Sequence, residues 1–368
     1  MSLSQNQLNR SRDLALQLTD RQRRILKAIV ETYIAEAEPV GSKSLLASQN
    51  WQISSATVRK EMADLENAGF LEQPHTSAGR VPTDLGYRVY VDDLLTPYQL
   101  QAAERASLHS FLDENLRELE STLRAAAHSL SVVTGLTAMV LLPQYEASEL
   151  RHLHLILIEA GRALCVMVLS SGIVKDFLLE LAPTLGKEEV EALAKALEEG
   201  LAGQRLSEIS AEEIASSLFL LQLEDGQAEQ VVKAVMSGIQ AAQNLEIYVE
   251  GEHLLLQQPE FQDPERANLT FSEFRNPGGL LTYLEPHEES LLPLVKIGQE
   301  LAFAGLSDLS LIAANYSKGN NLRGQIAVIG PRRMAYSSII SKIKYLQQSL
   351  SRSRPELAKE DLDVEEEA

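Results

Sequence analysis

The chain has 368 residues, of which 45% are hydrophobic, and its formal net charge at pH 7 is −19. This length allows two or three domains with their own cores. The polar first residues argue against a secretory signal, no apolar run approaches the roughly 20 residues of a membrane span, and the single cysteine excludes a disulfide framework and a thiolate zinc site. We therefore expect a cytoplasmic, multidomain protein without membrane association, in which Cys165 is a buried strand thiol rather than a nucleophile.

The charge is unevenly distributed along the chain. From Arg10 to Lys60, nine lysines and arginines stand against five acidic residues, so this segment carries +4 and the rest of the chain −23. Charges more than about 8–10 Å apart are largely screened at cellular ionic strength. The acidic total therefore does not exclude nucleic-acid binding by a basic N-terminal face.

Three helices are predicted in the first seventy residues. Thr19 opens the first helix and forms a capping box with Gln22. We expect Ser42 to cap a second, short helix, and either Ser54 or Ser55 to cap a third.

The third helix has one face suited to the core and one suited to DNA. Val58, Met62 and Leu65 fall at positions i, i+4 and i+7 and are expected to be buried. The opposite face places small residues beside long polar or cationic ones, which suits a helix that enters a major groove. Gly69 is expected to end this helix.

A hairpin is predicted next. Residues 70–72 and 81–82 read as short strands around a loop, in which Gly79 is expected to allow a tight turn and Arg80 to touch phosphate or the minor groove. Three helices and such a hairpin are typical of a winged helix-turn-helix. These units also serve as protein-docking modules, but we favour DNA binding. The candidate DNA-contacting residues are Ser42, Lys43, Ser55, Thr57, Arg59, Lys60, His75, Thr76, Ser77 and Arg80.

Further helices are predicted between residues 83 and 133. One begins at Thr83 and ends near Pro97, and a long helical run then continues to about Val133. Apolar residues keep a 4-3 spacing over three heptads of this run: Leu112, Leu116, Leu119, Leu123, Ala126, Leu130 and Val133. The spacing admits a coiled-coil dimer, but three heptads is the lower limit for one, so packing against the protein's own sheet is the preferred interpretation.

An antiparallel meander is predicted at residues 150–158, 163–169 and 173–181. His152 and His154 share one face of the first strand and raise the hypothesis of a metal site. No third ligand lies at a suitable spacing, so we interpret them as solvated or hydrogen-bonded and expect no metal.

A helical block interrupts the predicted strands. Residues 187–244 are rich in Ala, Leu and Glu and predict helices, and a strand pair at 246–249 and 253–257 follows. Two more strands are predicted at 309–316 and 322–329. A sheet interrupted by helices indicates one α+β domain with an insertion.

Two features close the chain. Residues 330–333 (GPRR) lie between a strand and a helix, where backbone amides can hold an anion. We prefer to interpret them as a turn that packs the final helix. Residues 356–368 are mostly acidic and are expected to be disordered.

Two long N-terminal stretches, LTDRQRRILKAIVETYIAEAEPVGSKSL and SSATVRKEMADLENAGFLEQPHTSAGRVPTDLGYRVYVDDLL, closely resemble the HrcA family of heat-inducible transcription repressors. The stretch GQIAVIGPRRMAYSSIISKIKYLQQSLS near the C-terminus resembles the same family. Together they cover residues 18–95 and 309–350, in the family's order and spacing. Where the family commonly has an asparagine after the arginine of the recognition helix, this chain has Lys60.

The resemblance implies a GAF-like domain that is split by an inserted dimerisation domain. The expected fold class is therefore α+β multidomain, with an N-terminal winged helix-turn-helix and a GAF-like antiparallel-sheet domain that contains a mainly helical insertion. The expected divisions are a flexible leader (1–17), a winged-helix DNA-binding domain (18–97), a split GAF-like domain (98–186 and 258–350), an inserted dimerisation domain (187–257) and an acidic disordered tail (351–368).

The resemblance also implies a function. It predicts a homodimeric repressor of heat-shock chaperone operons that binds double-stranded DNA at an inverted-repeat operator, is inactivated by heat stress and depends on a chaperonin. The alternative is a winged-helix regulator that senses a small metabolite through its GAF-like domain. An enzyme is disfavoured because the sequence shows no nucleophile elbow, metal cluster or glycine-rich phosphate loop, and we expect no cofactor.

Overall fold

The computed structural model describes residues 18–48, 51, 53–75, 78–113, 119–142, 148–170, 172–221, 223–224, 226–243, 247–275, 293–301, 306–318 and 322–351. The expected leader at 1–17 and the tail from residue 352 lie outside these ranges. Helices and antiparallel strands are combined as expected for the α+β class. None of the described helices is both long enough and apolar enough to cross a membrane.

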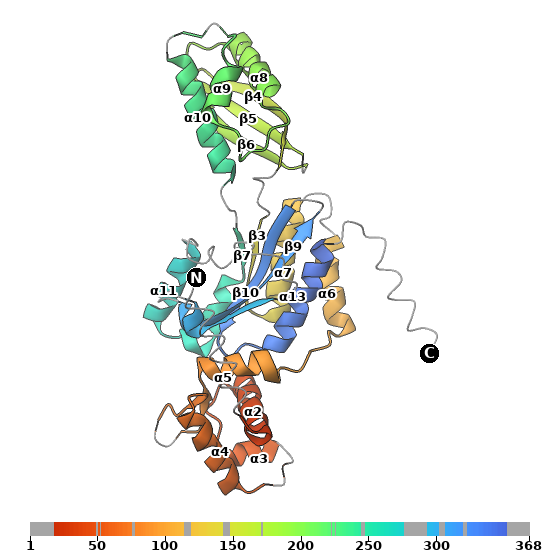
Figure 1. The fold of residues 1–368 in the computed structure, drawn as a ribbon, viewed down its shortest axis with the longest axis vertical. Coiled ribbons are helices and arrows are strands. Elements are labelled where there is room, and N and C mark those ends of the chain that lie inside the picture. Colours follow the sequence, from red (N-terminus) through yellow and green to blue (C-terminus); the bar gives the residue numbers. More distant parts are fainter. Residues whose placement is uncertain are drawn as a thin grey trace, which may run out of the picture. The chain divides into compact units, whose positions relative to one another are not determined.

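Contacts divide the chain into two compact units. Unit 1 comprises Met1–Val140, Tyr248–Asn315 and Gln325–Ser349, and unit 2 comprises Leu141–Ile247, Tyr316–Gly324 and Leu350–Ala368. Figure 1 labels the elements of both units.

The described part of unit 1 begins with three helices and a two-stranded hairpin, in the predicted order. We call residues 18–82 the N-terminal head. Its elements are α2 (Asp20–Glu36), α3 (Ser42–Ser48), α4 (Ser55–Asn67), β1 (Leu71–Glu72) and β2 (Val81–Pro82). The capping box between Thr19 and Gln22 is confirmed at the start of α2. The assignment of the head to the winged-helix fold stays a prediction.

The starts of α3 and α4 refine the predicted caps. Ser54 caps α4, because its Oγ accepts a hydrogen bond from the backbone N–H of Thr57 at 3.1 Å. Ser42 is the first residue of α3 and not its cap, so that prediction was wrong. The cap position belongs to Gly41, whose carbonyl accepts the first helical hydrogen bond from Leu45 at 3.0 Å.

The end of α4 is the predicted one. Gly69 has a φ of +85°, and its N–H donates to the carbonyl of Glu66 at 2.9 Å. The N–H of Phe70 donates to the carbonyl of Leu65 at 3.0 Å. These two bonds form a Schellman motif, which requires the left-handed conformation that glycine adopts without strain.

The hairpin is held against the segment between α2 and α3. Val40 and Arg80 exchange two backbone hydrogen bonds of 2.9 Å. A Cβ at Gly79 would overlap the backbone of Val40. Gly79 is not among the glycines with positive φ in the described chain. Its role is therefore close approach of two backbones, and the predicted role in a tight turn was wrong.

The helices that follow are shorter than predicted. α5 (Asp84–Val89) continues into the π-helical segment η1 (Tyr90–Leu94), and the long run expected up to Val133 is two helices, α6 (Ala102–Asp113) and α7 (Leu119–Thr134). α6 and α7 pack together, and Ser129 Oγ donates to the carbonyl of Ser107 at 3.4 Å. Leu123, Ala126 and Leu130 are fully buried inside the chain, and the structure shows α7 packed against α6. Packing of this stripe against the protein's own sheet stays a prediction.

Unit 1 also holds most of a five-stranded sheet. The strand order is β7–β3–β10–β9–β8. The bounds are β3 (Thr137–Leu141), β7 (Ile247–Glu250), β8 (Leu294–Ile297), β9 (Leu309–Lys318) and β10 (Leu322–Pro331). The final helix, α13 (Tyr336–Ser351), packs beside the end of α7, where Lys342 Nζ donates to the carbonyl of Val133 at 3.2 Å (Figure 1).

Several elements in and around this sheet differ from the sequence predictions. β3 and β8 were not predicted. The strand expected at 253–257 was wrong, because Gly251, with a φ of +77°, turns the chain into the 3-10 helix η2 (Glu252–Gln257). The other elements in the described residues of this part are η3 (Pro259–Phe261), α11 (Pro264–Arg275) and η4 (Gly298–Glu300).

Unit 2 contains the predicted meander as a sheet of its own. The strands β4 (Leu150–Glu159), β5 (Arg162–Leu169) and β6 (Val174–Glu180) pair antiparallel in this order. The expectation that they share one sheet with the C-terminal strands was wrong. Alternating hydrophobicity marks a strand but not its sheet.

The described residues of unit 2 also form three helices: α8 (Lys187–Leu201), α9 (Ala211–Ser217) and α10 (Gln227–Gln243). α8 contacts β4, and α10 contacts β6, where Gly238 lies against the ring of Phe177. The helices expected as a separate insertion at 187–257 are therefore packed with the meander, in a unit that begins near residue 141. Cys165 is buried in β5 as expected, and burial raises the pKa of its thiol to about 12.

Candidate nucleic-acid interface

Among the side chains of the head, those on α4 are best placed to contact a ligand. Ser54 holds the first turn of α4, and its hydroxyl also lies 2.9 Å from that of Thr57. Thr57 is half-buried, whereas Arg59 and Lys60 are exposed. Within the described part of the chain, neither of these two cations takes part in an ion pair. They are thus free to bind an anionic or hydrogen-bonding partner.

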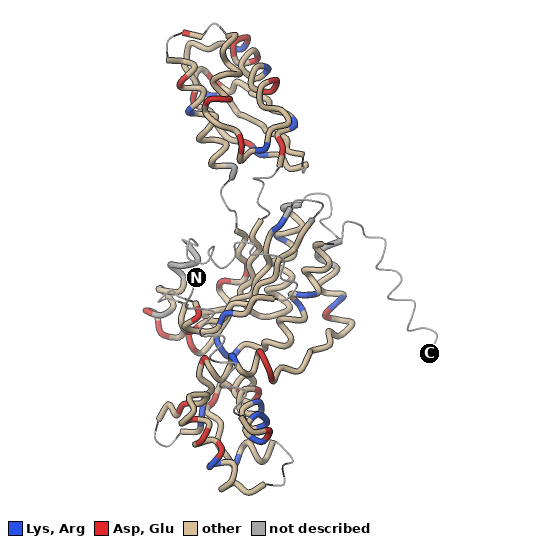
Figure 2. Tube along the Cα trace, in the orientation of Figure 1, with Lys and Arg blue, Asp and Glu red and all other residues tan. Residues whose placement is uncertain are grey.

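The neighbouring helices add further positive charge. Figure 2 shows lysines and arginines along α2, and Lys43 is exposed on α3. Part of this charge is compensated, because Arg21 lies 3.4 Å from Glu61 of α4 and Lys27 lies 3.8 Å from Glu31. The Arg21–Glu61 pair also links α2 to α4.

Two predicted contact residues hold α3 against α4. The hydroxyl oxygens of Ser42 and Ser55 lie 3.3 Å apart, and both side chains are half-buried. This contact brings the first turns of the two helices together. Lys43, next in the chain, therefore lies close to the start of α4.

The structure of the hairpin loop differs from the predicted one. His75 is exposed, while Thr76 and Ser77 lie outside the described residues. Arg80 does not project freely. Its Nε and Nη2 donate to the same oxygen of Glu66, Oε2, at 2.9 and 2.8 Å, and only 19% of its side chain is exposed. The ion pair holds the loop against α4, and contact between Arg80 and DNA stays a prediction.

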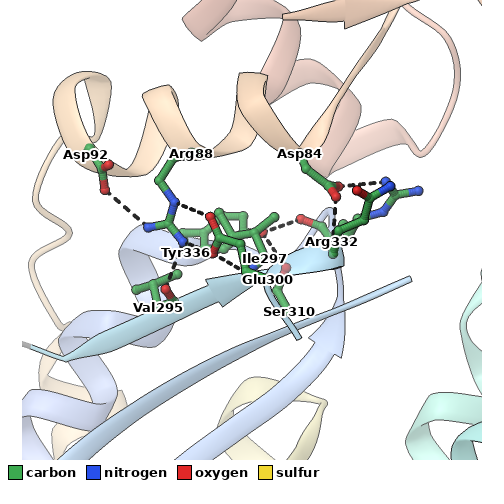
Figure 3. Close-up of polar contacts among 10 residues, drawn as sticks. Asp84, Arg88, Asp92, Val295, Ile297, Glu300, Ser310, Arg332 and Tyr336 are labelled. Carbon is green, nitrogen blue, oxygen red and sulfur yellow. Dashed lines mark hydrogen bonds and ion pairs between the residues drawn. The ribbon is translucent and has the colours of Figure 1, made fainter. Parts of the chain in front are cut away.

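Sequence reasoning missed a cluster of charged residues that joins α5 to the sheet of unit 1 (Figure 3). Arg88 is its centre, with only 7% of its side chain exposed. Its Nε donates to Glu300 Oε1 at 2.9 Å, its Nη2 contacts the other carboxylate oxygen of Glu300, and the same Nη2 donates to the carbonyl of Val295 at 2.8 Å. Nη1 donates to Asp92 at 3.3 Å.

The electrostatics of this cluster favour the charged form of Arg88 but disfavour that of Asp92. Burial acts to lower the pKa of Arg88, but its hydrogen bonds and charge attraction to Glu300 and Asp92 raise that pKa above the usual value. The pKa of Asp92 is raised, because burial outweighs the attraction of Arg88. A buried guanidinium with a two-point carboxylate contact has a well-defined geometry.

A second contact lies one helical turn earlier in α5. Asp84 accepts a hydrogen bond from Arg332 Nη1 at 2.8 Å and another from the backbone N–H of Gln299 at 3.0 Å. Arg332 also lies 3.4 Å from Asp308. Arg333 pairs with Glu260 at 2.6 Å. These contacts agree with the interpretation of residues 330–333 as a packing turn.

The two strand histidines are engaged with protein groups. His152 Nδ1 lies 2.9 Å from Glu198 Oε1, and the ring of His152 stacks on that of His154 with centroids 6.3 Å apart. Across the described ranges, no three His, Cys, Asp or Glu side chains are grouped so that they could hold a metal ion.

Comparison with known proteins gives one consistent result. A family model described as "HrcA protein C terminal domain" matches residues 120–340. The chain is 33% identical over 344 residues to the "Heat-inducible transcription repressor HrcA" of Symbiobacterium thermophilum, covering 91% of this chain and 98% of the relative. It is 34% identical over 335 residues to the protein of the same name from Halalkalibacterium halodurans, covering 91% and 97%.

A solved structure supports the fold. It is titled "Crystal structure of a hypothetical protein at 2.2 A resolution" and aligns with a TM-score of 0.62 at 24% identity. The alignment covers 91% of this chain and 98% of that chain. At this identity the likeness concerns the fold alone.

Proposed function

The chain belongs to the HrcA family of heat-inducible transcription repressors, and we propose that it represses heat-shock chaperone operons by binding an inverted-repeat operator as a homodimer. Like the relatives that are named heat-inducible transcription repressors, it is a transcription repressor and not an enzyme. We place its action in the cytoplasm, where the bacterial genome lies. A metabolite-sensing regulator is not favoured, because the relatives are named for heat-inducible repression.

The observation that carries the proposal is the surface of α4. This helix is capped at Ser54, buries Val58, Met62 and Leu65 in the head, and leaves Arg59 and Lys60 exposed without ion-pair partners among the described residues. Arginine and lysine can donate two hydrogen bonds to guanine in the major groove, and a good contact of this kind is worth about 1–3 kcal/mol of discrimination. We assign α4 as the reading helix.

Reading both halves of an inverted repeat requires two heads. Two-fold symmetry of the operator then mirrors two-fold symmetry of the protein. A second copy of the chain must therefore bury a surface that is exposed in one copy.

We assign that surface to the outer face of the β4–β5–β6 sheet, not to the helices of 187–257. Ile156, Val174 and Leu178 lie on this face and are 53–54% exposed, and the neighbouring Ile158 is 57% exposed. Ile156 and Leu178 both pair with Leu164 of the central strand, so an apolar row crosses the whole sheet. The opposite face is covered by α8 and α10. An exposed apolar sheet face is typical of an interaction surface.

The heat and chaperonin dependence rests on the family resemblance. We propose that heat stress inactivates the repressor and that a chaperonin maintains its active form, so that the operons are expressed when unfolded proteins occupy the chaperonin. The relatives' names support the heat-inducible part.

Footprinting tests the proposal directly. Purified protein is titrated onto the chaperone promoters of its own genome, with and without chaperonin. We expect protection of an inverted repeat that overlaps the promoter, and a larger active fraction with chaperonin present. A chain that protects no specific sequence in either condition would contradict the proposed function.

A further inference from the structure

The start of α5 is joined to the head by hydrogen bonds and close packing. Thr83 Oγ1, which caps α5, donates to the carbonyl of Gly69 at 2.7 Å, and the N–H of Thr83 donates to the carbonyl of Phe70 at 3.1 Å. A Cβ at Gly86 would overlap that same carbonyl of Phe70. Gly69 and Phe70 follow directly after the reading helix α4. On this side, α5 and the head form one continuous packed body.

The other side of α5 faces the sheet of unit 1. Asp84 and Arg88 are four residues apart and so lie on the same side of the helix, one turn from each other. Asp84 binds Arg332 at the end of β10, and Arg88 binds Glu300 and the backbone of Val295 in the β8 region. Figure 3 shows the two contacts side by side. Neither is a single flexible ion pair, because each carboxylate or guanidinium makes more than one bond.

Two contacts restrain a helix more than one does. One contact would let the helix pivot about a point, whereas two contacts one turn apart, about 5–6 Å, also fix the direction of the helix axis. Fixing α5 on the sheet fixes the head that is packed against it. The planar guanidinium of Arg88 adds rotational restraint that a lysine ammonium would not supply.

We propose that Asp84 and Arg88 are positioning residues that set the spacing between half-sites accepted by the repressor. The inference rests on the proposed function. One extra base pair between half-sites moves the second one by about 3.4 Å and rotates it by about 35°. A head held on the sheet of its own unit adds no freedom with which to follow this displacement, whereas a head on a loosened α5 does.

The experiment compares operators of different spacing. Binding is measured for the natural inverted repeat, for versions with one or two base pairs added or removed between the half-sites, for one half-site alone and for random duplex. The proteins are the full-length wild type, Arg88→Gln, and Lys342→Met as a matched control. Lys342 is as buried as Arg88, with 9% of its side chain exposed, and pairs with Glu104 at 3.1 Å elsewhere in unit 1.

For the wild type and Lys342→Met we expect affinity for the altered spacings to fall by about tenfold or more, which corresponds to about 1.4 kcal/mol. For Arg88→Gln we expect unchanged half-site affinity, weaker binding to the natural operator and a nearly flat dependence on spacing. Arg88→Gln with the spacing dependence of the wild type would overturn the inference. So would a wild type that binds the operator with equal affinity at every spacing.

A second variant covers the case in which Arg88→Gln does not fold. Asp84→Asn keeps the shape of a more exposed side chain and removes the charge that binds Arg332. For Asp84→Asn we expect operator affinity to depend less on half-site spacing than in the wild type, as for Arg88→Gln. An unchanged dependence in a folded Asp84→Asn variant would overturn the inference. Failure of the proposed function is recognised separately, because the wild type would then bind inverted repeat and random duplex equally.

Discussion

Arg80 and Glu66 form an ion pair across the head, with two guanidinium nitrogens on one carboxylate oxygen. The pair joins the hairpin loop to the last turn of α4. An arginine held in this way presents less net positive charge to DNA than a free one. The contribution of Arg80 to DNA affinity therefore depends on its competition with Glu66.

The first prediction is that Glu66→Gln strengthens DNA binding. Removal of the carboxylate charge leaves the cation of Arg80 uncompensated, and each added phosphate contact steepens the log–log salt dependence by about one unit. We expect higher affinity for operator and random duplex alike, measured by salt titration. Glu208→Gln, which neutralises a carboxylate paired with exposed Arg205 in unit 2, is the control. An unchanged salt slope in Glu66→Gln would mean that Arg80 only supports the hairpin.

The second prediction concerns Arg80 itself. Arg80→Ala should lower affinity for operator and random duplex together and reduce the salt slope by up to about one unit. The same titration measures both quantities. A loss of affinity without any change of slope would assign Arg80 to holding the loop on α4.

The third prediction concerns base reading by α4. Arg59→Ala and Lys60→Ala should each weaken operator binding by about 1–3 kcal/mol, because each removes a donor that we propose to contact a base. The melting temperature should stay close to that of the wild type, since both side chains are exposed. Lys195→Ala, which removes an exposed charge from α8, is the matched control. Unchanged operator affinity in a folded Arg59→Ala, Lys60→Ala double variant would remove α4 from the reading role.

The fourth prediction concerns the dimer. Ile156→Glu combined with Leu178→Glu places two charges on the outer face of the β4–β5–β6 sheet, where burial of a charge without a partner costs several kcal/mol. Sedimentation should show a monomer. Leu220→Glu, at a position that is 90% exposed outside the sheet, should stay dimeric. A double variant that remains a dimer would move the interface to another surface.

The fifth prediction uses the buried thiol of unit 2. Because burial raises the pKa of Cys165 to about 12, almost none of it is thiolate at pH 8. A thiol reagent should therefore modify Cys165 only when β5 opens, and the labelling rate should rise steeply at the temperature where unit 2 unfolds. Rapid, complete labelling of the folded protein at 25 °C would contradict the burial of the Cys165 thiol.

Several local features were predicted correctly from the sequence. The capping box of Thr19 and Gln22 and the helix end at Gly69 involve bonds between residues three to five positions apart, so the sequence pattern contains both partners. The meander at 150–180 was also found, because strand alternation is local. The sheet to which it belongs was not, since pairing partners are not encoded in alternation.

Long-range contacts account for what was missed. Arg88 and Glu300 are 212 positions apart, and the sequence around Arg88 is that of an ordinary helix. Arg80 and Glu66 are only 14 apart, but their pairing depends on how the hairpin folds back on α4. Gly79 was assigned a turn because the sequence shows the glycine and not the neighbouring backbone of Val40. Of the candidate site, exposure of α4 was predictable and the state of the loop was not.

The central claim is that the repressor reads an inverted repeat with α4 from two copies of the chain. Titration of the wild type onto a labelled operator, with stoichiometry read by sedimentation of the complex, tests it most directly. We predict one dimer per inverted repeat, bound about 10³-fold or more tighter than random duplex at physiological salt. A single chain per repeat, or equal affinity for repeat and random duplex, would contradict the account.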